Sequence, residues 1–486
     1  MLGRQDHHVL VFERYPQLYD LPRAAVFDHE VMRIWQSLGI QEEIGGDLQP
    51  VRDYVWYGAD GEQIMRIELN PEEVPSGWEP AYLFFQPRLE GALDRAARAL
   101  PTVELHRPWT ASSMKAHDDH VELVVSQDEK ARTVRARYVI GADGANSFVR
   151  QAAGIAWEDL GFAERWLTLD LRPHDIAALE RLPTSCQWCD PARPHMHTRN
   201  GREHRRWEFM LHPDERNEEF EDEARIWQLL APWIRPDEGT ILRHAVYEFR
   251  SLIAETMRSG RVLLAGDAAH LMPPFLGQGM CTGIRDAFNL AWKLDLVLRG
   301  ISPDLLLDTY TPERRPQSES IVRLSMEMGR VSCERDPAAA AERDTALRAA
   351  DAPPTILLPG LSEGVVARNG AGDATRLAGE LSVQGTVRHG GREGRFDDVI
   401  GNGWIVLSSA GNPRAGLSGE QLSFLDGLGT RFASLAELTD LDGRLTTWLS
   451  DHGAGTVIVR PDFYVFGEVT AGGELGALVD ELRDRL

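Results

Sequence analysis

Three short apolar runs, each ending at small or acidic residues, are the clearest pattern along this chain. They cover residues 8–12, 137–141 and 261–265, and they lead to Glu13, Asp143 and Asp267. Unbroken runs of this length are typical of parallel strands buried on both faces. The carboxyl ends of such strands face the ligand crevice of an α/β sheet. The pattern therefore predicts an α/β core with a ligand site close to Asp143 and Asp267.

A helical pattern starts at Gly279, directly after a Gly-rich turn. Apolar residues recur there at steps of three and four, with polar residues between them: Met280, Ile284, Ala287, Ala291 and Leu294 are apolar, and Arg285, Asp286 and Lys293 are polar. This spacing predicts an amphipathic helix.

The rest of the chain divides by composition. We expect a core over 1–335, with mainly β insertions at about 45–110 and 155–255 that cover the substrate; the run 205–211 is an example. Residues 336–370 predict an Ala-rich helical segment and a linker, which includes Asp351-Ala352-Pro353-Pro354. Short strand patterns at 403–408 and 456–461 and a closing helix at 474–486 predict a small α/β tail over 371–486.

Composition and charge exclude several classes of protein. Of the 486 residues, 43% are hydrophobic and 26% charged, as in ordinary globular chains. Asp and Glu outnumber Lys and Arg by 75 to 52, and a net charge of −23 disfavours binding to nucleic acid or anionic lipid. The sequence shows neither a secretory signal nor a membrane span, so we expect a cytoplasmic protein with no membrane partner.

The four cysteines include one CxxC pair, Cys186 and Cys189, with His195 and His197 close behind. A zinc site or a redox dithiol has this spacing. No second Cys pair or correctly spaced His pair completes a tetrahedral set, so we favour ordinary buried cysteines and predict no metal site.

Residues 266–280 carry the most informative pattern. An Asp that leaves a buried strand, here Asp267, can accept hydrogen bonds from sugar hydroxyls. Pro273 and Pro274 stiffen the next turn, while Gly277 and Gly279 let the backbone approach a flat ring closely. The helix that follows directs unpaired amides and the positive end of its dipole at the same place. Such a site stabilises an anion.

This segment resembles the second flavin-binding motif of flavin-dependent aromatic hydroxylases related to p-hydroxybenzoate hydroxylase. It is most similar to the branch of 3-(3-hydroxyphenyl)propionate and 3-hydroxycinnamate hydroxylases, which shares the continuation through residues 285–294. The resemblance implies a doubly wound, glutathione-reductase-like FAD-binding core. It implies that FAD is held by Gly266, Asp267, Pro274, Gly277, Gln278, Gly279 and Met280.

Other positions match the family more locally. Asp143 and Gly144, with Arg150 following, resemble its Asp-Gly motif, which serves FAD and the nicotinamide nucleotide; alone, an Asp-Gly pair is usually a turn. The resemblance further implies that Glu13 and Arg14 bind the FAD adenosine and that Arg23 and Gln86 lie at the cofactor: the alternative for each is a solvated polar residue.

The front of the chain departs from the family pattern. Members carry a GxGxxG turn for the pyrophosphate roughly twenty residues before the equivalent of Glu13. Here twelve residues precede Glu13, with Gly3 as their single glycine. We therefore expect the first strand, this turn and most of the first helix to be missing, through a start assigned too far downstream or through a real loss that weakens cofactor binding.

The tail resembles the thioredoxin-like domain of several members but contains no cysteine, which excludes dithiol chemistry there. We expect it to serve packing or oligomerisation, for example in a homodimer. Residues 460–465 match the closing strand of that family's domain.

The resemblance implies an FAD monooxygenase: NADH or NADPH reduces the flavin, and dioxygen then supplies the oxygen atom that hydroxylates a small phenol, such as a 3-hydroxyphenylpropionate. Tyr247 is a weak candidate for contact with the substrate hydroxyl, and His270 is expected to be structural. Two alternatives stay open, a flavin oxidoreductase that inserts no oxygen and a non-catalytic homologue.

Overall fold

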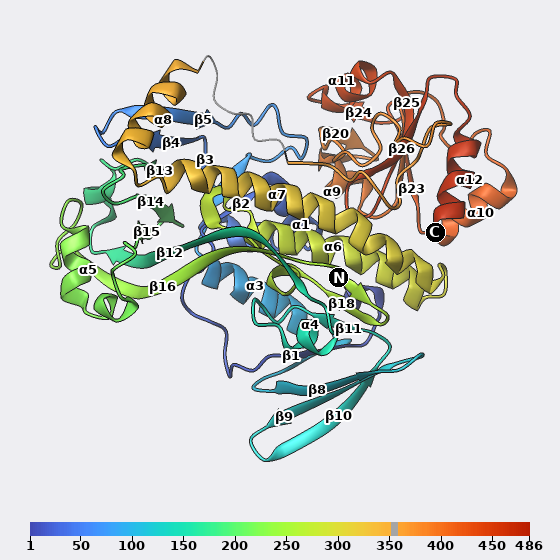
Figure 1. Ribbon diagram of the computed structural model, residues 1–486. Helices are drawn as coiled ribbons and strands as arrows, with labels where there is room; N and C mark the ends of the chain where they lie inside the picture. The colour runs from blue at the N-terminus through green and yellow to red at the C-terminus, as the bar shows by residue number, and fades with distance from the viewer. Residues whose placement is uncertain (351–357) are drawn as a thin grey trace.

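The computed structural model describes residues 1–350 and 358–486 (Figure 1). Two long helices, α6 (Gly279–Leu298) and α7 (Tyr310–Ser332), run through the middle of the molecule in Figure 1. The C-terminal region, coloured orange to red, lies at one end of this pair, and the β8–β10 hairpins project from the bottom of the view.

The three apolar runs form parallel strands, as predicted. Strand β1 (Val9–Phe12) pairs with β7 (Val103–His106), and β11 (Val139–Gly141) pairs with β18 (Val262–Leu264), whose other neighbour is the antiparallel β17 (Arg258–Ser259). The prediction that all three are buried on both faces is wrong for two of them, because Val11 is 39% exposed and Ile140 is 40% exposed. Among the described residues these strands belong to separate sheets of two and three strands, which cover them incompletely.

An eight-stranded sheet collects strands from both sides of residue 150. Its order is β19-β16-β12-β15-β14-β13-β4-β5. The strands are β4 (Asp53–Tyr57), β5 (Gln63–Glu68), β12 (Trp157–Pro173), β13 (Ser185–Trp188), β14 (His195–Asn200), β15 (His204–Met210), β16 (Gly239–Ala254) and β19 (His270–Leu271). The predicted run 205–211 overlaps β15, and all residues of that strand are buried. Its Arg206 pairs with the buried Asp170 at 2.8 Å.

The other elements of the first 350 residues are shorter. Two further sheets contain β2 (Val26–Asp28), β3 (Gln49–Val51) and β6 (Ala81–Leu83), and β8 (Thr110–Ala116), β9 (Val121–Gln127) and β10 (Lys130–Ala136). The helices are α1 (His29–Ser37), α2 (Gln41–Gly45), α3 (Gln86–Arg98), α4 (Phe148–Ala152), α5 (Glu223–Leu230) and α8 (Pro337–Ala349), with 3-10 turns η1 (Leu2–Gln5), η2 (Ile176–Leu179), η3 (Asn217–Phe220), η4 (Gly266–Ala268), η5 (Pro274–Leu276) and η6 (Asp304–Thr309).

Helix α6 starts at Gly279 as predicted, but its amphipathic assignment is wrong. Arg285, Asp286 and Lys293 are buried, whereas Ala287, assigned to the apolar face, is exposed. Neighbouring elements surround the helix and supply counter-charges for its polar residues, and a paired charge can be buried where an isolated one cannot.

The C-terminal region has the strand arrangement of the expected thioredoxin-like tail. Its main sheet has the order β23-β22-β25-β26, with a parallel pair β22–β23 and antiparallel partners on the other side. The strands are β20 (Thr386–His389), β21 (Arg392–Arg395), β22 (Ile405–Ser408), β23 (Arg431–Ser434), β24 (Thr439–Asp440), β25 (Ala454–Val459) and β26 (Val465–Thr470), and the helices are α9 (Phe396–Ile400), α10 (Gly419–Gly427), α11 (Arg444–Asp451) and α12 (Leu475–Arg485).

Two sequence predictions for the C-terminal part of the chain concern a strand and a linker. The strand predicted over 460–465 is a turn as far as residue 464, and β26 begins at Val465. Phe463 adopts a φ of 70° in this turn, and its amide donates to the Arg460 carbonyl. The predicted linker sequence Asp351-Ala352-Pro353-Pro354 lies outside the described residues.

A buried ionic cluster joins the C-terminal region to the core. The Arg460 guanidinium lies 2.7 Å from the Glu313 carboxylate on α7, and the Lys293 ammonium on α6 lies 2.9 Å from the same carboxylate. On another side, Arg33 of α1 forms a bidentate pair with Asp397, at 2.6 and 2.9 Å. Such pairs fix the orientation of the two regions because each charge depends on its partner.

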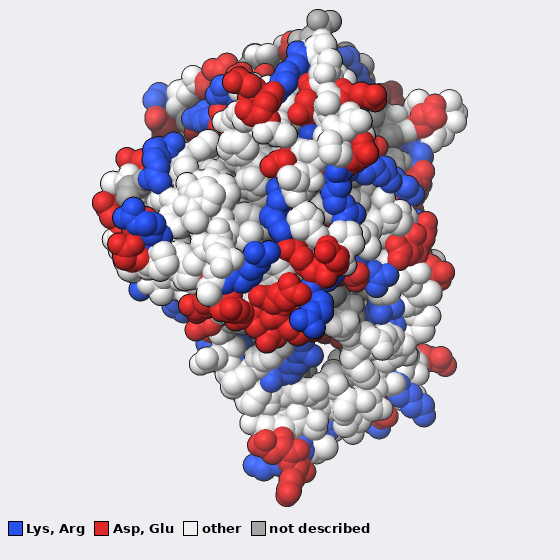
Figure 2. Space-filling model, turned by 60° about the vertical axis from the view of Figure 1, so that its left-hand side comes forward, with Lys and Arg blue, Asp and Glu red and all other residues white. Residues whose placement is uncertain are grey.

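The face shown in Figure 2 carries acidic and basic side chains interspersed, with acidic groups gathered in a band near its middle. None of the helices in the described part of the chain has the length and apolar character that a membrane crossing requires.

Candidate functional site

The segment 266–280 forms a compact turn between β18 and α6. Gly266 and Gly277 both have positive φ, 63° and 64°, which favours glycine. A Cβ on Gly277 would collide with Cγ1 of Val26, and a Cβ on Gly283 would lie 2.9 Å from the Cα of Gly266. Gly283 thus allows the helix to pass close to the turn. This glycine is not among the site residues predicted from the sequence.

The N-terminus of α6 is open to a ligand. The N-cap residue Gln278 provides no side-chain cap, and a Cβ on Gly279 would meet nothing closer than Met272 Cγ at 3.7 Å. The first amides of a helix have no partner inside it, and they carry the positive end of the helix dipole. A flat group that becomes anionic on reduction, such as the flavin of FAD, fits this combination of space and donors.

Asp267 lies beside this helix start. Its side chain is accessible, yet burial by surrounding protein raises its pKa, with His270 and Arg23 acting in the opposite direction.

Asp286 on α6 holds the turn in place from inside. Its carboxylate accepts hydrogen bonds from the Gly266 amide at 3.0 Å and from Arg314 at 2.9 Å, and it lies 2.7 Å from Nε2 of the buried His270. His270 is therefore a structural residue, as expected. The pKa of Asp286 is lowered by His270 and Arg314 against the effect of its burial, which keeps it a carboxylate.

Gln86 and Arg23 meet through the backbone. The Gln86 side-chain oxygen accepts hydrogen bonds from the amides of Arg23 and Ala24, at 2.9 and 2.6 Å, and the Arg23 guanidinium pairs with Glu90 at 2.9 Å. Gln86 thus positions the loop that carries Arg23, and its direct contact with the cofactor stays a prediction.

The same loop is held from the opposite side by the eight-stranded sheet. Arg206 and Arg243 both donate to the Pro22 carbonyl, at 3.1 and 2.6 Å, and both pair with the buried Asp170. No local sequence pattern indicates this network, because its members are separated by up to 221 positions and come together only when the sheet forms.

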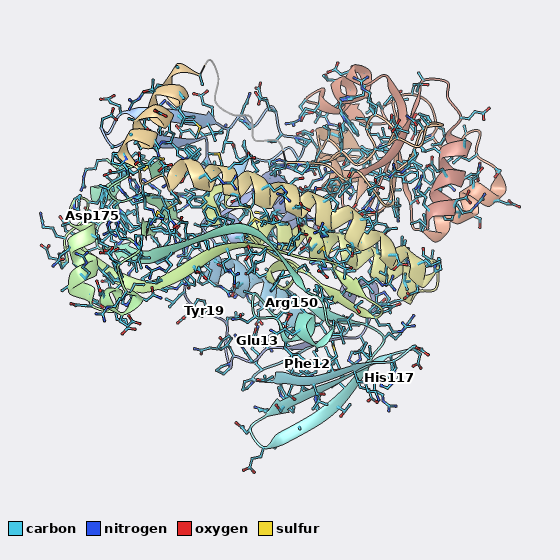
Figure 3. All side chains as sticks on the ribbon, in the orientation of Figure 1. Phe12, Glu13, Tyr19, His117, Arg150 and Asp175 are labelled. Atoms are coloured by element: carbon cyan, nitrogen blue, oxygen red, sulfur yellow. The ribbon has the colours of Figure 1, made fainter. Side chains whose placement is uncertain are left out.

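Tyr247 lies in the same region and is not buried, with 39% of its surface exposed. The Arg243 guanidinium lies 5.1 Å from its ring and 5.9 Å from the ring of Tyr19, and the Arg23 guanidinium lies 5.3 Å from that second ring. Arg23, whose charge acts on Asp267, thus lies over the Tyr19 ring. Tyr19 and Tyr247 share the Arg243 guanidinium, so Tyr19 links the two ends of this region. Figure 3 labels Tyr19 in the lower middle of the molecule.

The Asp143-Gly144 turn is built largely from its own contacts. Gly144 has a φ of 80°, and the Asp143 carboxylate accepts hydrogen bonds from the Val149 amide at 3.0 Å and from the Ser147 hydroxyl. Arg150 donates to the Ile155 carbonyl at 2.8 Å. These side chains organise the start of α4, and their contact with a cofactor stays a prediction.

Glu13 and Arg14 lie just after the carboxyl end of β1. The Glu13 carboxylate accepts the Tyr15 amide at 2.9 Å, and Arg14 donates to the Tyr15 hydroxyl at 3.1 Å. Figure 3 labels Glu13 and Arg150 in the same lower part of the molecule as Tyr19. The binding of adenosine by Glu13 and Arg14 remains a prediction.

The CxxC pair is buried and its thiols are free. Burial raises the pKa of both Cys186 and Cys189 to about 12, which keeps them protonated at neutral pH. The Cys186 sulfur lies 3.1 Å from Nε2 of His197, whose pKa burial lowers to about 3. These residues are packed as part of the sheet.

Known proteins resemble this chain over almost its whole length. A family model described as "FAD binding domain" matches residues 1–325, and one described as "HcaD C-terminal domain" matches residues 379–485. A probable NADH-specific resorcinol 4-hydroxylase of Rhodococcus jostii (strain RHA1) is 41% identical, over 99% of this chain and 91% of that protein. A 3-(3-hydroxy-phenyl)propionate/3-hydroxycinnamic acid hydroxylase of Mycobacterium sp. (strain KMS) is 32% identical, over 97% of this chain and 86% of that protein.

Solved structures share the fold. An aklavinone-11 hydroxylase in complex with FAD and aklavinone aligns over 100% of this chain and 96% of its own, with a TM-score of 0.78 and 24% identity. A flavin-dependent monooxygenase in complex with FAD and substrate aligns over the same shares, with a TM-score of 0.81 and 21% identity. The chain therefore belongs to the FAD-binding-domain family and is a FAD-dependent aromatic hydroxylase.

Proposed function

We propose that this protein uses NADH and dioxygen to hydroxylate a small, uncharged phenol of the resorcinol type. NADH and resorcinol are named for the relative that is 41% identical over almost the whole chain. The 3-hydroxyphenylpropionate relatives, at 32% identity, make a phenol with a carboxylate side chain the second candidate.

The charges around Tyr19 and Tyr247 decide between the neutral phenol and the phenol with a carboxylate. Arg206 and Arg243 are the buried cations there; Asp170 pairs with both, and Glu208 lies 3.7 Å from Arg206. Each of the two guanidinium groups thus has a carboxylate partner in Asp170. A substrate carboxylate needs an unpaired cation to replace its water, so this neighbourhood favours a neutral ring.

The protein's own groups have separate tasks in this proposal. Bound FAD supplies the redox chemistry. The amides at the start of α6 stabilise negative charge next to them, with no reorganisation, in the manner of an oxyanion hole. Asp286 and Gln86 hold the two backbone segments that border the site, and Tyr247 contacts the substrate hydroxyl and relays its proton.

The test compares two phenols on the FAD-loaded protein. We expect resorcinol to stimulate NADH oxidation with a kcat/KM at least about ten-fold above that of 3-(3-hydroxyphenyl)propionate, a difference of ~1.4 kcal/mol in transition-state binding. Isotopically heavy dioxygen should label the product, detected by mass spectrometry. The reverse preference would refute the choice of substrate.

The same assay separates the alternative functions. Hydrogen peroxide equal to the NADH consumed, without a labelled product, would indicate a flavin oxidoreductase that inserts no oxygen. A protein that binds no FAD at all would indicate a non-catalytic homologue. The proposal further takes the protein to act in the cytoplasm and to form a homodimer, and light scattering of the purified protein checks the second point.

A further inference from the structure

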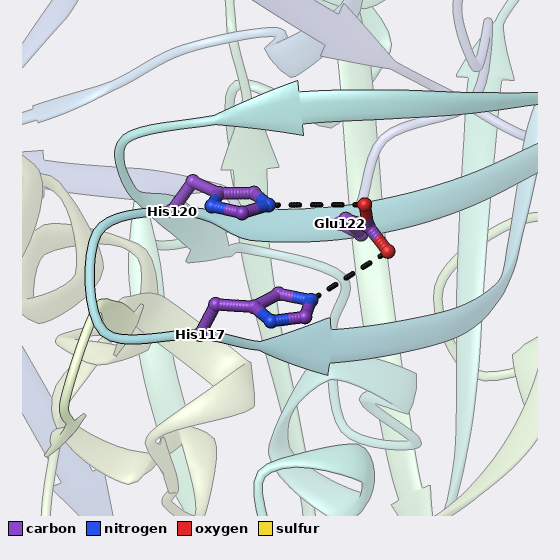
Figure 4. A group of neighbouring side chains, drawn as sticks. All are labelled: His117, His120 and Glu122. Atoms are coloured by element: carbon purple, nitrogen blue, oxygen red, sulfur yellow. Dashed lines mark ion pairs between the residues drawn. The ribbon is translucent and has the colours of Figure 1, made fainter.

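Two histidines and a glutamate meet at the turn between β8 and β9. The His117 amide donates to the His120 carbonyl at 2.8 Å, which closes the turn. The two imidazole rings are stacked, with centroids 4.5 Å apart and planes within 8°. Glu122, at the start of β9, faces both rings (Figure 4).

The distances among these groups suit a metal ion better than hydrogen bonds. His117 Nε2 lies 3.6 Å from one Glu122 oxygen, and His120 Nε2 lies 3.7 Å from the other. Both separations exceed a normal hydrogen bond. Two ligand atoms that each lie ~2.1 Å from a tetrahedral zinc ion are ~3.4 Å apart. The three ligand atoms all lie within 4.8 Å of one another.

The two Nε2 atoms are buried and have no hydrogen-bond partner. A buried polar atom without a partner costs free energy, so two of them directed at one carboxylate call for a further group. A cation bound between the three side chains satisfies all of them at once.

Surrounding residues orient these ligands as second-layer groups do in metal sites. The Asp119 carboxylate lies 2.7 Å from Nδ1 of His120, which leaves the lone pair of Nε2 for a metal. Arg135 donates to the Glu122 oxygen that faces His120, at 2.8 Å, and so fixes the carboxylate. The three ligand side chains keep 25–30% of their surface exposed, which gives an ion and a water molecule access.

We propose that His117, His120 and Glu122 bind a divalent transition-metal ion of the zinc type, with water as the fourth ligand. The ion closes the β8–β9 hairpin. This hairpin is tied to the base of β18, because Arg261 donates to the Asp118 carbonyl at 2.7 Å. In Figure 3, His117 lies at the turn end of that hairpin, on the far side of Phe12 from Tyr19. The role is structural.

Calorimetric titration of the chelator-treated, FAD-loaded protein with zinc chloride tests the site. We expect one saturable equivalent per chain. His117→Ala and His120→Ala should each weaken it at least about ten-fold, as loss of a metal ligand does. His8→Ala is the matched control: it removes an exposed histidine that lies 2.6 Å from Glu104, and it should leave zinc binding unchanged.

Two further measurements show whether the substitutions act on the metal site alone. Far-UV circular dichroism and FAD content should be the same in all variants, because the hairpin turn is at the surface. Glu122→Gln, which keeps the shape of the side chain, should also weaken binding. Absence of saturable zinc binding in the wild type, or equal binding by the wild type and His117→Ala, would overturn the proposal.

Discussion

The carboxylate of Asp286 accepts a hydrogen bond from the backbone amide of Gly266, 20 positions earlier in the chain, at 3.0 Å. This contact ties the inside of α6 to the turn that precedes the helix. The same carboxylate neutralises Arg314 and contacts His270. The turn at 266–280, the proposed flavin site, thus rests on a buried ionic network.

Asp286→Asn should therefore loosen the turn and leave the buried Arg314 unpaired. We expect a loss of ~3–5 kcal/mol in the free energy of unfolding, as for other broken buried pairs, together with lower FAD content. Denaturant unfolding and flavin absorbance measure the two effects. Asp308→Asn removes an exposed carboxylate next to Arg258 and should cost no more than ~1 kcal/mol; equal losses in the two variants would contradict this account.

Gly279→Val tests the open helix start. A Cβ at this position would lie 3.7 Å from Met272 Cγ, its nearest protein neighbour outside the helix backbone, so the stability of the FAD-free protein should change by less than ~1 kcal/mol. If the flavin lies there, the added methyl groups should weaken FAD binding by roughly ten- to hundred-fold, from an overlap of ~1–3 kcal/mol.

The matched control is Gly419→Val, at the first position of α10, where no atom lies within 4 Å. Fluorescence titration with FAD compares the two variants. Unchanged FAD affinity in Gly279→Val would remove the flavin from the start of α6.

Because of Glu313, the free energy of unfolding should depend on pH in the acid range. Its pKa is lowered to about 2, against burial, by Arg460 and Lys293. Unfolding raises that pKa to its ordinary value, so the unfolded chain binds more protons between about pH 4.5 and about pH 2, and the stabilisation from Glu313 is lost as the pH falls through this window. The full effect, ~3 kcal/mol, is present above it.

Glu313→Gln should therefore be less stable than the wild type at pH 7, and the difference should shrink as the pH falls from about 4.5 to about 2. Glu319→Gln, on the same helix but with the partly exposed Arg315 and Arg323 as its partners, should show little difference at any pH. A gap between Glu313→Gln and the wild type that stays constant with pH would argue against the assignment.

The cysteines should be inert in the folded protein. All four are buried, and the pKa of Cys186 and Cys189 is about 12. Ellman's reagent, which reacts with thiolates, should label none of them in the native state and four after denaturation. A Ser450→Cys variant, with the new thiol on an exposed position, should react once and validates the assay.

Tyr247→Phe tests the proton relay. Loss of the hydroxyl should lower kcat for resorcinol by at least about ten-fold, leave FAD content unchanged and flatten the pH dependence of kcat. Tyr57→Phe, on strand β4 and stacked on Trp188, is the control and should retain the wild-type rate. An unchanged kcat and pH profile in Tyr247→Phe would exclude Tyr247 from this role.

The sequence by itself determined the family, the α/β class, the start of α6 at Gly279 and the turn at Gly277 before it. These are local properties: an apolar run, a spacing of three and four, or a positive φ at Gly277 is encoded within a few residues. The same local signals placed Arg285, Asp286 and Lys293 on the polar face of α6, although all three are buried. A short stretch of sequence does not show the distant residues whose opposite charges permit that burial.

The tertiary structure alone decided how those distant groups combine. Asp170 meets Arg206 and Arg243 across neighbouring strands, Gln86 reaches the loop at Arg23, and Arg460 reaches Glu313 from the tail. The cluster at His117 is short in sequence, yet only the hairpin geometry turns both imidazoles toward one carboxylate. Charge pairing depends on distance in space, and the fold sets that distance.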